Sequence, residues 1–217
     1  MQSTVPAPAP ADQGRALWLS TIAFTVCFAA WTIFSILGVQ IQRDLNLSEA
    51  QFGLLVGTPI LTGSLVRLVL GVWTDQFGGR IVYTLVMLIA AAATWMLSYA
   101  YDYTTFLIAA LGIGMAGGSF AVGIAYVSKW YPKEKQGTAL GIFGAGNVGA
   151  AVTKFLAPLV MIALGWQAVA QIWAAALAVT AVVFFLMTKD DPDLVARRAR
   201  GVKPESFASM MAPLKNV

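Results

Sequence analysis

Residues 16–41 read ALWLSTIAFTVCFAAWTIFSILGVQI, an apolar run without a charged residue. A helix needs about 20 mostly apolar residues to cross the hydrocarbon core of a bilayer, whereas the apolar core of a secretory signal peptide has only about 7–15. This run is longer than both, no basic segment precedes it, and it contains no convincing cleavage pattern. It therefore predicts a helix that spans a membrane.

Further apolar runs follow along the rest of the chain. With the first they make six candidate spans: 16–41, 52–73, 81–100, 105–128, 138–163 and 166–188. A membrane β-strand would show alternating segments of about ten residues, whereas these runs are continuous. The composition agrees, because 59% of the residues are hydrophobic and 11% are charged, against about 25% charged in soluble domains. We predict an all-α fold, a polytopic bundle of six transmembrane helices in a lipid bilayer.

The two ends of the chain are polar, and the basic residues set the expected orientation. Residues 1–15 are rich in proline and alanine and predict a disordered cytoplasmic leader, and residues 189–217 predict a cytoplasmic tail. With the N-terminus inside, the inside loops and tail hold most of the Lys and Arg residues, while the outside loops hold Arg43 alone. Lys and Arg accumulate on the cytoplasmic side of membrane proteins. We therefore expect a multi-pass protein of the cell (inner) membrane with both termini in the cytoplasm.

Several classes of function do not suit this composition. The sequence has no histidine and one cysteine, Cys27, which leaves no zinc site, no disulfide framework and no histidine base. The basic residues lie between and after apolar runs and form no stripe with aromatic residues, so nucleic acid is not an expected partner. We expect no enzyme activity, no metal ion and no cofactor.

Two cations, Arg67 and Lys154, fall inside predicted spans, whereas the ten acidic residues all fall in loops or tails. A cation deep in a membrane costs about 2.5–3.5 kcal/mol on insertion scales. Either side chain could instead extend to the headgroups, and Arg67 lies only roughly 9 Å from the end of its span. We favour an arginine that faces a cavity, with its positive charge neutralised by an anion or by an acidic group of a partner protein. The planar guanidinium suits a small oxyanion, because it donates two parallel N–H bonds.

The fifth span carries a small residue at almost every fourth position and contains Gly144, Gly146, Asn147 and Gly149. Small residues allow a neighbouring helix to pack closely. The spacing also matches G-x-G-x-x-G, but a dinucleotide site needs a preceding strand, so we reject that interpretation. Asn147 is a polar anomaly, and Lys154 lies seven residues later on nearly the same helical face. Asn147 could simply join two helices.

The linker after the second span reads Gly71-Val-Trp-Thr-Asp75-Gln-Phe-Gly78-Gly79-Arg80. Glycine supplies positive φ in tight turns, Asp75 can accept from the start of the next helix, and Arg80 can pair nearby. The same residues could form an ordinary short turn. Their spacing resembles G-x-x-x-D-x-x-G-x-[RK], the loop motif of the major facilitator superfamily, which is linked there to conformational switching.

The sequence as a whole resembles the nitrate/nitrite porter family of that superfamily. The resemblance rests on Arg67, on the stretch from Gly117 to Ala121, on the turn that begins at Tyr131, and on the stretch from Gly141 to Gly149. The last of these is similar to the glycine-rich nitrate signature of the family. The resemblance to the family covers residues 16–188, which correspond to the N-terminal half of a fold with twelve helices in two halves.

The resemblance implies roles for individual residues. Arg67 would coordinate the anion, Phe120 would pack against its plane, and Asn147 with Gly144, Gly146 and Gly149 would form a mobile wall of the pathway. Without the resemblance, Phe120 fits ordinary packing better. Lys154 stands where some members have glutamine, which suggests coupling or subtype choice. A second arginine would come from the other half, and residues 189–217 would begin the linker between the halves.

These observations lead to one main hypothesis and two alternatives. The main hypothesis is transport of nitrate or nitrite by alternating access, incomplete without a second six-helix half or self-association. The first alternative is a transporter of another anion, such as an organic acid. The second is a membrane scaffold that does not transport, or a truncated relic.

Overall fold

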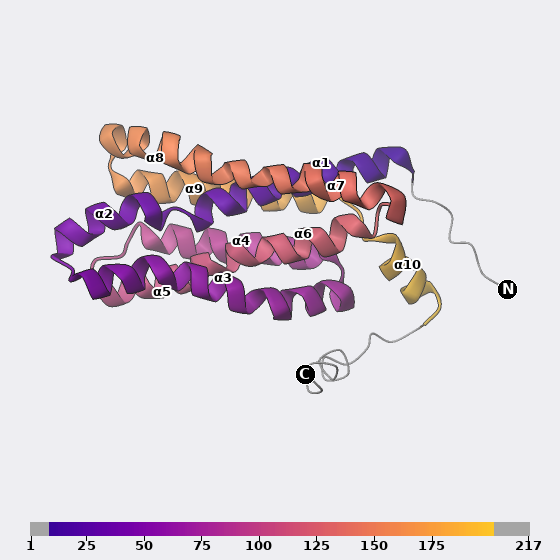
Figure 1. The fold of residues 1–217 in the computed structure, drawn as a ribbon, viewed down its shortest axis with the longest axis horizontal. Helices are drawn as coiled ribbons and strands as arrows, with labels where there is room; N and C mark the ends of the chain where they lie inside the picture. The colour runs from indigo at the N-terminus through magenta and orange to yellow at the C-terminus, as the bar shows by residue number, and fades with distance from the viewer. Residues whose placement is uncertain (1–8, 202–217) are drawn as a thin grey trace.

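The computed structural model describes residues 9–201, and residues 1–8 and 202–217 lie outside the described part. The described residues form helices joined by short connections (Figure 1). The α-helices are α1 (Pro10–Trp31), α2 (Phe34–Leu45), α3 (Glu49–Phe77), α4 (Gly79–Leu97), α5 (Tyr103–Gly114), α6 (Ser119–Ser128), α7 (Lys133–Gly144), α8 (Gly149–Leu164), α9 (Trp166–Met187) and α10 (Pro192–Ala199). Two 3₁₀ segments, η1 (Met115–Gly118) and η2 (Ala145–Val148), connect α5 to α6 and α7 to α8.

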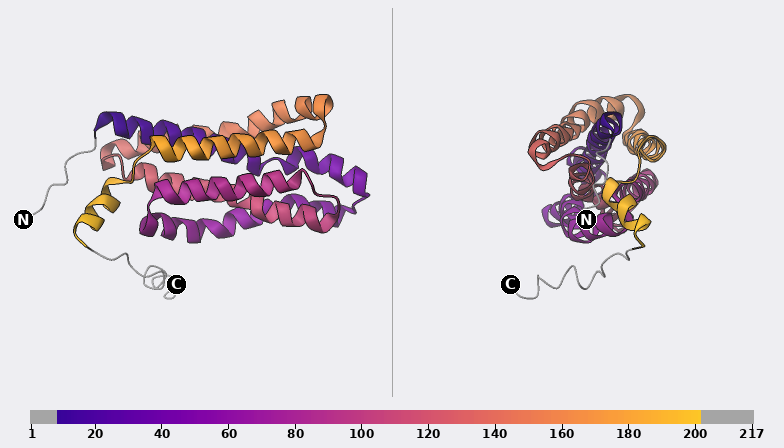
Figure 2. Two further views of the ribbon diagram at one scale, coloured as in Figure 1. Left: turned by 180° about the vertical axis from the view of Figure 1, so that it is seen from behind. Right: turned by 90° about the vertical axis from the view of Figure 1, so that its right-hand side faces the viewer.

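Six helical stretches are long and apolar enough to cross a membrane: 10–45, 49–77, 79–97, 103–128, 133–164 and 166–187. They run side by side along one common direction (Figure 2). The predicted all-α bundle with six spans is confirmed, and each predicted span overlaps one of these stretches.

The first span does not begin or continue as expected. Residues 10–15, predicted to be part of a disordered leader, are helical instead, because Pro10 and Asp12 suit the first turn of a helix. The start of α1 is also tied to the end of α9 by an ion pair of 3.0 Å between Asp12 and Lys189. Further along, the span breaks between α1 and α2, where the Thr32 hydroxyl donates to the carbonyl of Phe28. Such a bond competes with the regular helix and bends it.

The 3₁₀ segments lie at the two glycine-rich stretches that the sequence singled out. η1 contains Gly117 and Gly118, and η2 contains Gly146 and Asn147. Glycine and asparagine are poor helix formers, and a 3₁₀ turn within a span often marks a hinge. Both segments contact α1, whose side chains Phe24 and Cys27 are buried in the core.

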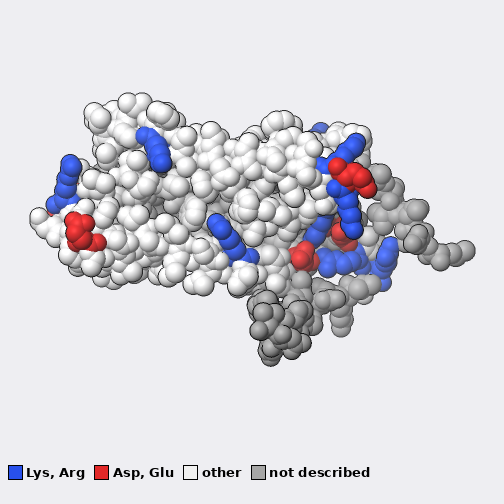
Figure 3. Space-filling view, viewed as in Figure 1, with Lys and Arg blue, Asp and Glu red and all other residues white. Residues whose placement is uncertain are grey.

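Charged side chains gather mainly at the ends of the bundle, and the larger group lies at the end that holds α10 (Figure 3). We call this the charged end. Between the ends the visible surface is mostly uncharged, with isolated cationic side chains.

Candidate functional site

Arg67 lies in the middle of α3, and its side chain reaches residues from two other parts of the bundle. Its Nε donates to the carbonyl oxygen of Gly117 over 3.1 Å. The guanidinium carbon lies 5.7 Å from the ring centroid of Trp31 and 5.9 Å from that of Phe120. Within residues 9–201 no carboxylate pairs with Arg67, and its terminal nitrogens donate to no protein acceptor. These two nitrogens are therefore free for a ligand.

Glycines allow the helices to approach closely at this point. A Cβ on Gly117 would lie 2.6 Å from Nε1 of Trp31 and 3.1 Å from the Cα of Gly63. The Nε1–H of Trp31 donates to the Pro59 carbonyl over 2.8 Å, which fixes the indole ring beside Arg67. Larger residues at the glycine positions would separate α3 from η1 and move the Gly117 carbonyl away from the arginine.

Phe120 has both of the roles considered from the sequence. Its ring centroid lies 5.4 Å from that of Phe24 and 6.0 Å from that of Phe143, so it belongs to an aromatic cluster of the core. The same ring also lies 5.9 Å, centroid to Cζ, from the Arg67 guanidinium. The arginine is thus placed between two aromatic side chains that come from different spans.

Asn147 and its neighbouring glycines lie at η2, on the other glycine-rich segment. Asn147 is exposed, and its Nδ2 donates back to the Gly144 carbonyl over 2.8 Å. A Cβ on Gly149 would lie 2.0 Å from the Thr25 carbonyl oxygen, and one on Gly146 would lie 2.5 Å from the Phe24 ring. Gly144 has no such neighbour within 4 Å. Two of the three glycines therefore hold η2 and α8 close to α1, and the third is open.

Lys154 is exposed on α8, and no hydrogen bond or ion pair within residues 9–201 involves it. The preceding residue, Thr153, is buried instead. Its hydroxyl donates to the Ala29 carbonyl over 2.7 Å and accepts from Nε1 of Trp173 over 2.9 Å. α8 is thus anchored by Thr153, and Lys154 projects from the surface of the bundle. No side chain of residues 9–201 supplies the polar partner expected from its depth, and the predicted role of Lys154 stays a prediction.

The predicted site residues are only partly brought together. Arg67 and Phe120 are direct neighbours, and Phe24 links Phe120 to the segment of Gly146. Asn147 of η2 and Lys154 of α8 are both exposed, apart from the pair of Arg67 and Phe120.

The junction between α3 and α4 contacts two other segments, the end of α6 and α10. The Asp75 carboxylate lies 2.8 Å from Nζ of Lys129 at the end of α6, and the Asp75 carbonyl accepts from Arg197 of α10. Nζ of Lys129 also lies 3.9 Å from a carboxylate oxygen of Asp191, which is fully buried. The Asp75 carboxylate, expected to accept from the start of α4, thus pairs with Lys129 after α6, and the Asp75 backbone carbonyl joins the same point to α10.

Arg80 and the glycines of the loop also contact neighbouring segments. Nε and Nη2 of Arg80 donate to the Phe185 carbonyl over 3.0 and 2.7 Å, so Arg80 caps the end of α9. Gly78 has a φ of +93°, which favours glycine, and a Cβ there would lie 2.4 Å from Leu194 of α10. Gly71 has no neighbour within 4 Å of its Cβ position in the described part of the chain.

Comparison with known proteins bears directly on this loop and bundle. The family model of the Major Facilitator Superfamily matches residues 19–217. The chain belongs to this superfamily. A bacterial homologue of the human lysosomal transporter Spinster, crystallised inward-facing and unoccupied, has the same fold with a TM-score of 0.75 and 20% identity. The match covers 85% of this chain and 45% of that one.

Relatives with curated names are more similar in sequence. The chain is 40% identical to the "Probable nitrate/nitrite antiporter NarK1" of Thermus thermophilus, over 95% of this chain and 48% of that protein. It is 34% identical to the "Nitrite extrusion protein" of Bacillus subtilis, over 78% and 43%. It is 39% identical to the "Probable nitrate/nitrite transporter NarK2" of Mycobacterium tuberculosis H37Rv, over 83% and 46%. The chain spans about half the length of the curated relatives it matches.

Sequence reasoning missed several residues that matter in this member of the Major Facilitator Superfamily. Lys129 is one of the cations expected on the inside, and its ion pair with Asp75 does not follow from the sequence. Asp191 and Arg197 lie in the segment taken as a polar tail. The signal that could have found α10 is the sequence Asp191-Pro192, a capping acid followed by a proline suited to the first helical turn.

Proposed function

We propose that this chain forms the N-terminal six-helix half of a transporter for a small inorganic oxyanion, nitrate or nitrite, that works by alternating access. The observation that carries the proposal is the environment of Arg67, a cation within a span that has free terminal donors, no carboxylate partner in the described chain and aromatic rings on two sides. The names of the relatives support nitrate and nitrite as the anions.

The chemistry of the arginine fits such an anion. Nitrate and nitrite are planar, and two of their oxygens match the two parallel N–H bonds that a guanidinium donates. The rings of Trp31 and Phe120 limit the space around the guanidinium, so a flat ligand can lie against them. Exclusion of water would strengthen the charge interaction. Because arginine stays protonated, any proton coupling would use other groups.

A second six-helix half would complete the site. Exposed apolar side chains remain on α3, the helix of Arg67 (Leu61, Leu65 and Leu68), and on α8, the helix of Lys154 (Phe155, Leu159 and Ile162). In superfamily transporters two such halves rock around a site at the middle of the membrane. We propose that a second half, or failing that a second copy of this chain, covers these faces.

The proposed orientation places the charged end in the cytoplasm of a cell whose inner membrane holds the protein. The positive-inside rule supports this, because Lys129, Lys133, Arg197 and Arg198 all lie at or near that end.

Uptake of labelled nitrite into proteoliposomes tests the proposal. The chain is reconstituted alone and together with the C-terminal half of the Thermus relative, and each preparation is sized to establish whether it is a monomer. We expect uptake only from the paired halves. Robust uptake by a monomer of this chain would contradict the need for a second half.

Competition and one substitution separate the alternatives. Unlabelled nitrate should compete with nitrite, whereas competition by organic acids but not by nitrate would indicate another anion. Arg67→Lys keeps the charge but loses the bidentate geometry, so we expect a large loss of uptake. If Arg67→Lys in the paired protein changes nothing, a scaffold without transport activity is the better description.

A further inference from the structure

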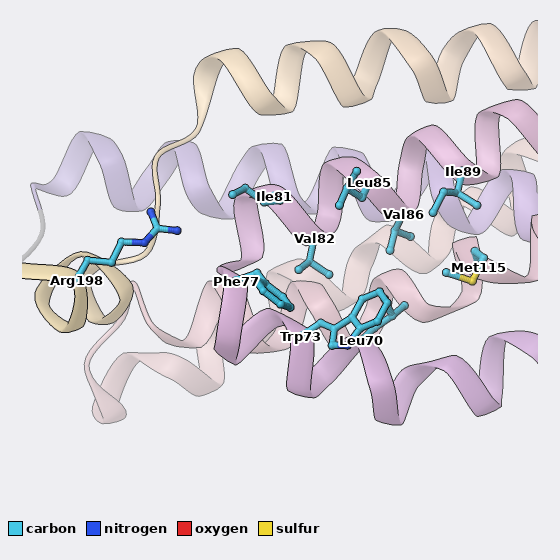
Figure 4. A pocket seen from close by; sticks show the side chains of 10 residues that line it. All are labelled: Leu70, Trp73, Phe77, Ile81, Val82, Leu85, Val86, Ile89, Met115 and Arg198. Atoms are coloured by element: carbon cyan, nitrogen blue, oxygen red, sulfur yellow. The ribbon is translucent and has the colours of Figure 1, made fainter. Parts of the chain in front are cut away.

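A groove of about 410 Å³ runs between α3 and α4, and it opens on the outer surface of the bundle. We call it the α3–α4 groove. Its walls are Trp73 and Phe77 of α3 and Ile81, Leu85 and Ile89 of α4, and Met115 of η1 lies at the end far from Arg198 (Figure 4). The walls are apolar, and the one charged residue among the lining residues is Arg198 of α10, which lies at the charged end of the groove.

The groove is on a different side of α3 from the surface proposed for the second half. At about 100° per residue, Leu70, Trp73 and Phe77 lie roughly 90° around the helix from Arg67 in one direction. The exposed residues Leu61, Leu65 and Leu68 lie roughly 130° from Arg67 in the other direction. A second half that covers these leucines therefore leaves the groove facing the membrane.

Arg198 is held in place at the end of this groove. α10 is fixed because the Asp191 carboxylate caps its first turn over 2.9 Å and Leu194 is buried against Gly78. Nη1 of Arg198 lies 2.9 Å from a carboxylate oxygen of Asp190, and its side chain is still 56% exposed. One of its five N–H donors bonds to Asp190, and no other hydrogen bond of the Arg198 guanidinium is found within residues 9–201.

A second arginine near α4 provides a contrast. Arg80 gives two hydrogen bonds to the Phe185 carbonyl and stacks over the Phe185 ring at 4.4 Å. Arg80 is therefore engaged in closing α4 against α9. Arg198 stands at the same end of the bundle, but its ion pair with Asp190 leaves 56% of its side chain exposed.

We propose that the α3–α4 groove binds a phospholipid with an anionic headgroup, with one acyl chain between the two helices and the phosphate at Arg198. The apolar walls match the chain, and the open donors of a fixed arginine match the phosphate oxygens. Basic residues beside grooves between membrane helices recognise anionic headgroups in this way, and the cytoplasmic leaflet is where such lipids are enriched. The assignment of the leaflet rests on the proposed orientation, but the site itself does not depend on anion transport.

Photolabelling tests the proposal on the full chain in nanodiscs. The probes are phosphatidylglycerol and phosphatidylcholine, each with a diazirine on one acyl chain, and the adducts are mapped by mass spectrometry. We expect phosphatidylglycerol to label residues of the groove walls about fivefold more than phosphatidylcholine does, which corresponds to roughly 1 kcal/mol for one arginine near a headgroup.

Two substitutions and their matched controls locate the site. Arg198→Gln should remove the preference for phosphatidylglycerol, Arg198→Lys should restore much of it, and Arg43→Gln at the opposite end of the bundle should leave it unchanged. Leu85→Trp should fill the groove and reduce labelling by both lipids. Leu65→Trp, at another exposed leucine of α3, should not.

Three results would overturn the proposal. The first is equal labelling by the two lipids, and the second is adducts concentrated at Leu61, Leu65 and Leu68 instead of the groove walls. The third is loss of the groove adducts when a second six-helix half is added, because the groove would then belong to the contact between halves. Circular dichroism of each variant establishes that it keeps its helices, and the lysine variant serves as the second readout if Arg198→Gln does not fold.

Discussion

Arg67 and Lys154 are both cations within membrane-spanning helices, yet their surroundings differ completely. Arg67 contacts a carbonyl and two aromatic rings that belong to α1, η1 and α6. Lys154 is exposed on α8 and makes no polar contact within residues 9–201. The cost of placing either charge in a membrane is similar on insertion scales. The polar and aromatic groups that neighbouring helices place near the side chain therefore decide whether a cation is bound within the bundle or remains exposed.

The glycines of the two regions also act on different sides of their helices. Near Arg67, Gly117 lets the Trp31 ring and α3 approach the arginine itself. Near Lys154, Gly149 lets α8 press against the backbone of α1, on a side of α8 turned away from the lysine. Close packing thus forms a site in the first region and only a helix contact in the second.

The largest expected effect comes from Gly149→Ala. The new methyl group would meet the Thr25 carbonyl oxygen at 2.0 Å, and overpacking of this kind costs about 1–3 kcal/mol or more. Gly144→Ala is the matched control, because no atom lies within 4 Å of its Cβ position, and it should be neutral or slightly stabilising. Thermal unfolding in detergent measures both. Equal stability of the two variants would show that α8 does not depend on the contact with α1.

Arg67→Lys should give the next largest effect, on anion binding by the paired halves. Loss of a charge-assisted hydrogen bond costs about 1.5–3 kcal/mol, which corresponds to roughly tenfold to hundredfold weaker binding. Isothermal titration with nitrite measures the change. Binding that is unchanged in this variant would remove the main distinction between Arg67 and Lys154.

Phe120→Leu should weaken anion binding less than Arg67→Lys does. A cation–π contact contributes about 0.5–1 kcal/mol at such sites, so we expect a loss of roughly twofold to fivefold. The same titration applies, with Phe28→Leu as the control, because the Phe28 ring packs against Phe24 and Trp31, whereas the rings beside the Arg67 guanidinium are those of Trp31 and Phe120. An equal loss in the control would assign the effect to packing of the aromatic cluster.

Lys154→Gln should leave the stability of the isolated chain nearly unchanged. The side chain is exposed and has no polar partner in the described part, and such surface changes usually stay within about 0.5 kcal/mol. Thermal unfolding of the chain alone gives the answer. A large destabilisation would mean that Lys154, like Arg67, has a structural partner inside the chain.

The smallest effect concerns pH, and it should come from outside the spans. The Thr105 backbone N–H holds the pKa of Asp102, the cap of α5, below its ordinary value. A lowered pKa in the folded state means that the stabilisation is present at neutral pH and is lost as the pH falls through that pKa. Unfolding midpoints at decreasing pH should therefore fall slightly less for Asp102→Asn than for the unchanged chain. An identical pH dependence would show that this cap contributes nothing.

The sequence allowed more of the fold than of the site to be predicted. Helical spans follow from long apolar runs, which are local, and all six were found. The approach of Arg67 to Phe120 could be expected only from family resemblance, because the two residues lie on different helices. α10 was missed because an eight-residue helix has no long apolar run, and its folding depends on distant partners such as Asp75 and Gly78.

The order of residues along the chain therefore determined that six helices are long and apolar enough to cross a membrane. It placed their ends to within about six residues and showed that two cations lie within them. Only the tertiary structure decided that Arg67 is enclosed by Trp31 and Phe120, that Lys154 is left open, and that the segment after α9 returns to hold the loop at Asp75. The physical reason is the separation in sequence over which each interaction acts. Helix formation and hydrophobicity act between near neighbours in sequence, whereas the partner of a buried charge is set by how helices pack against one another.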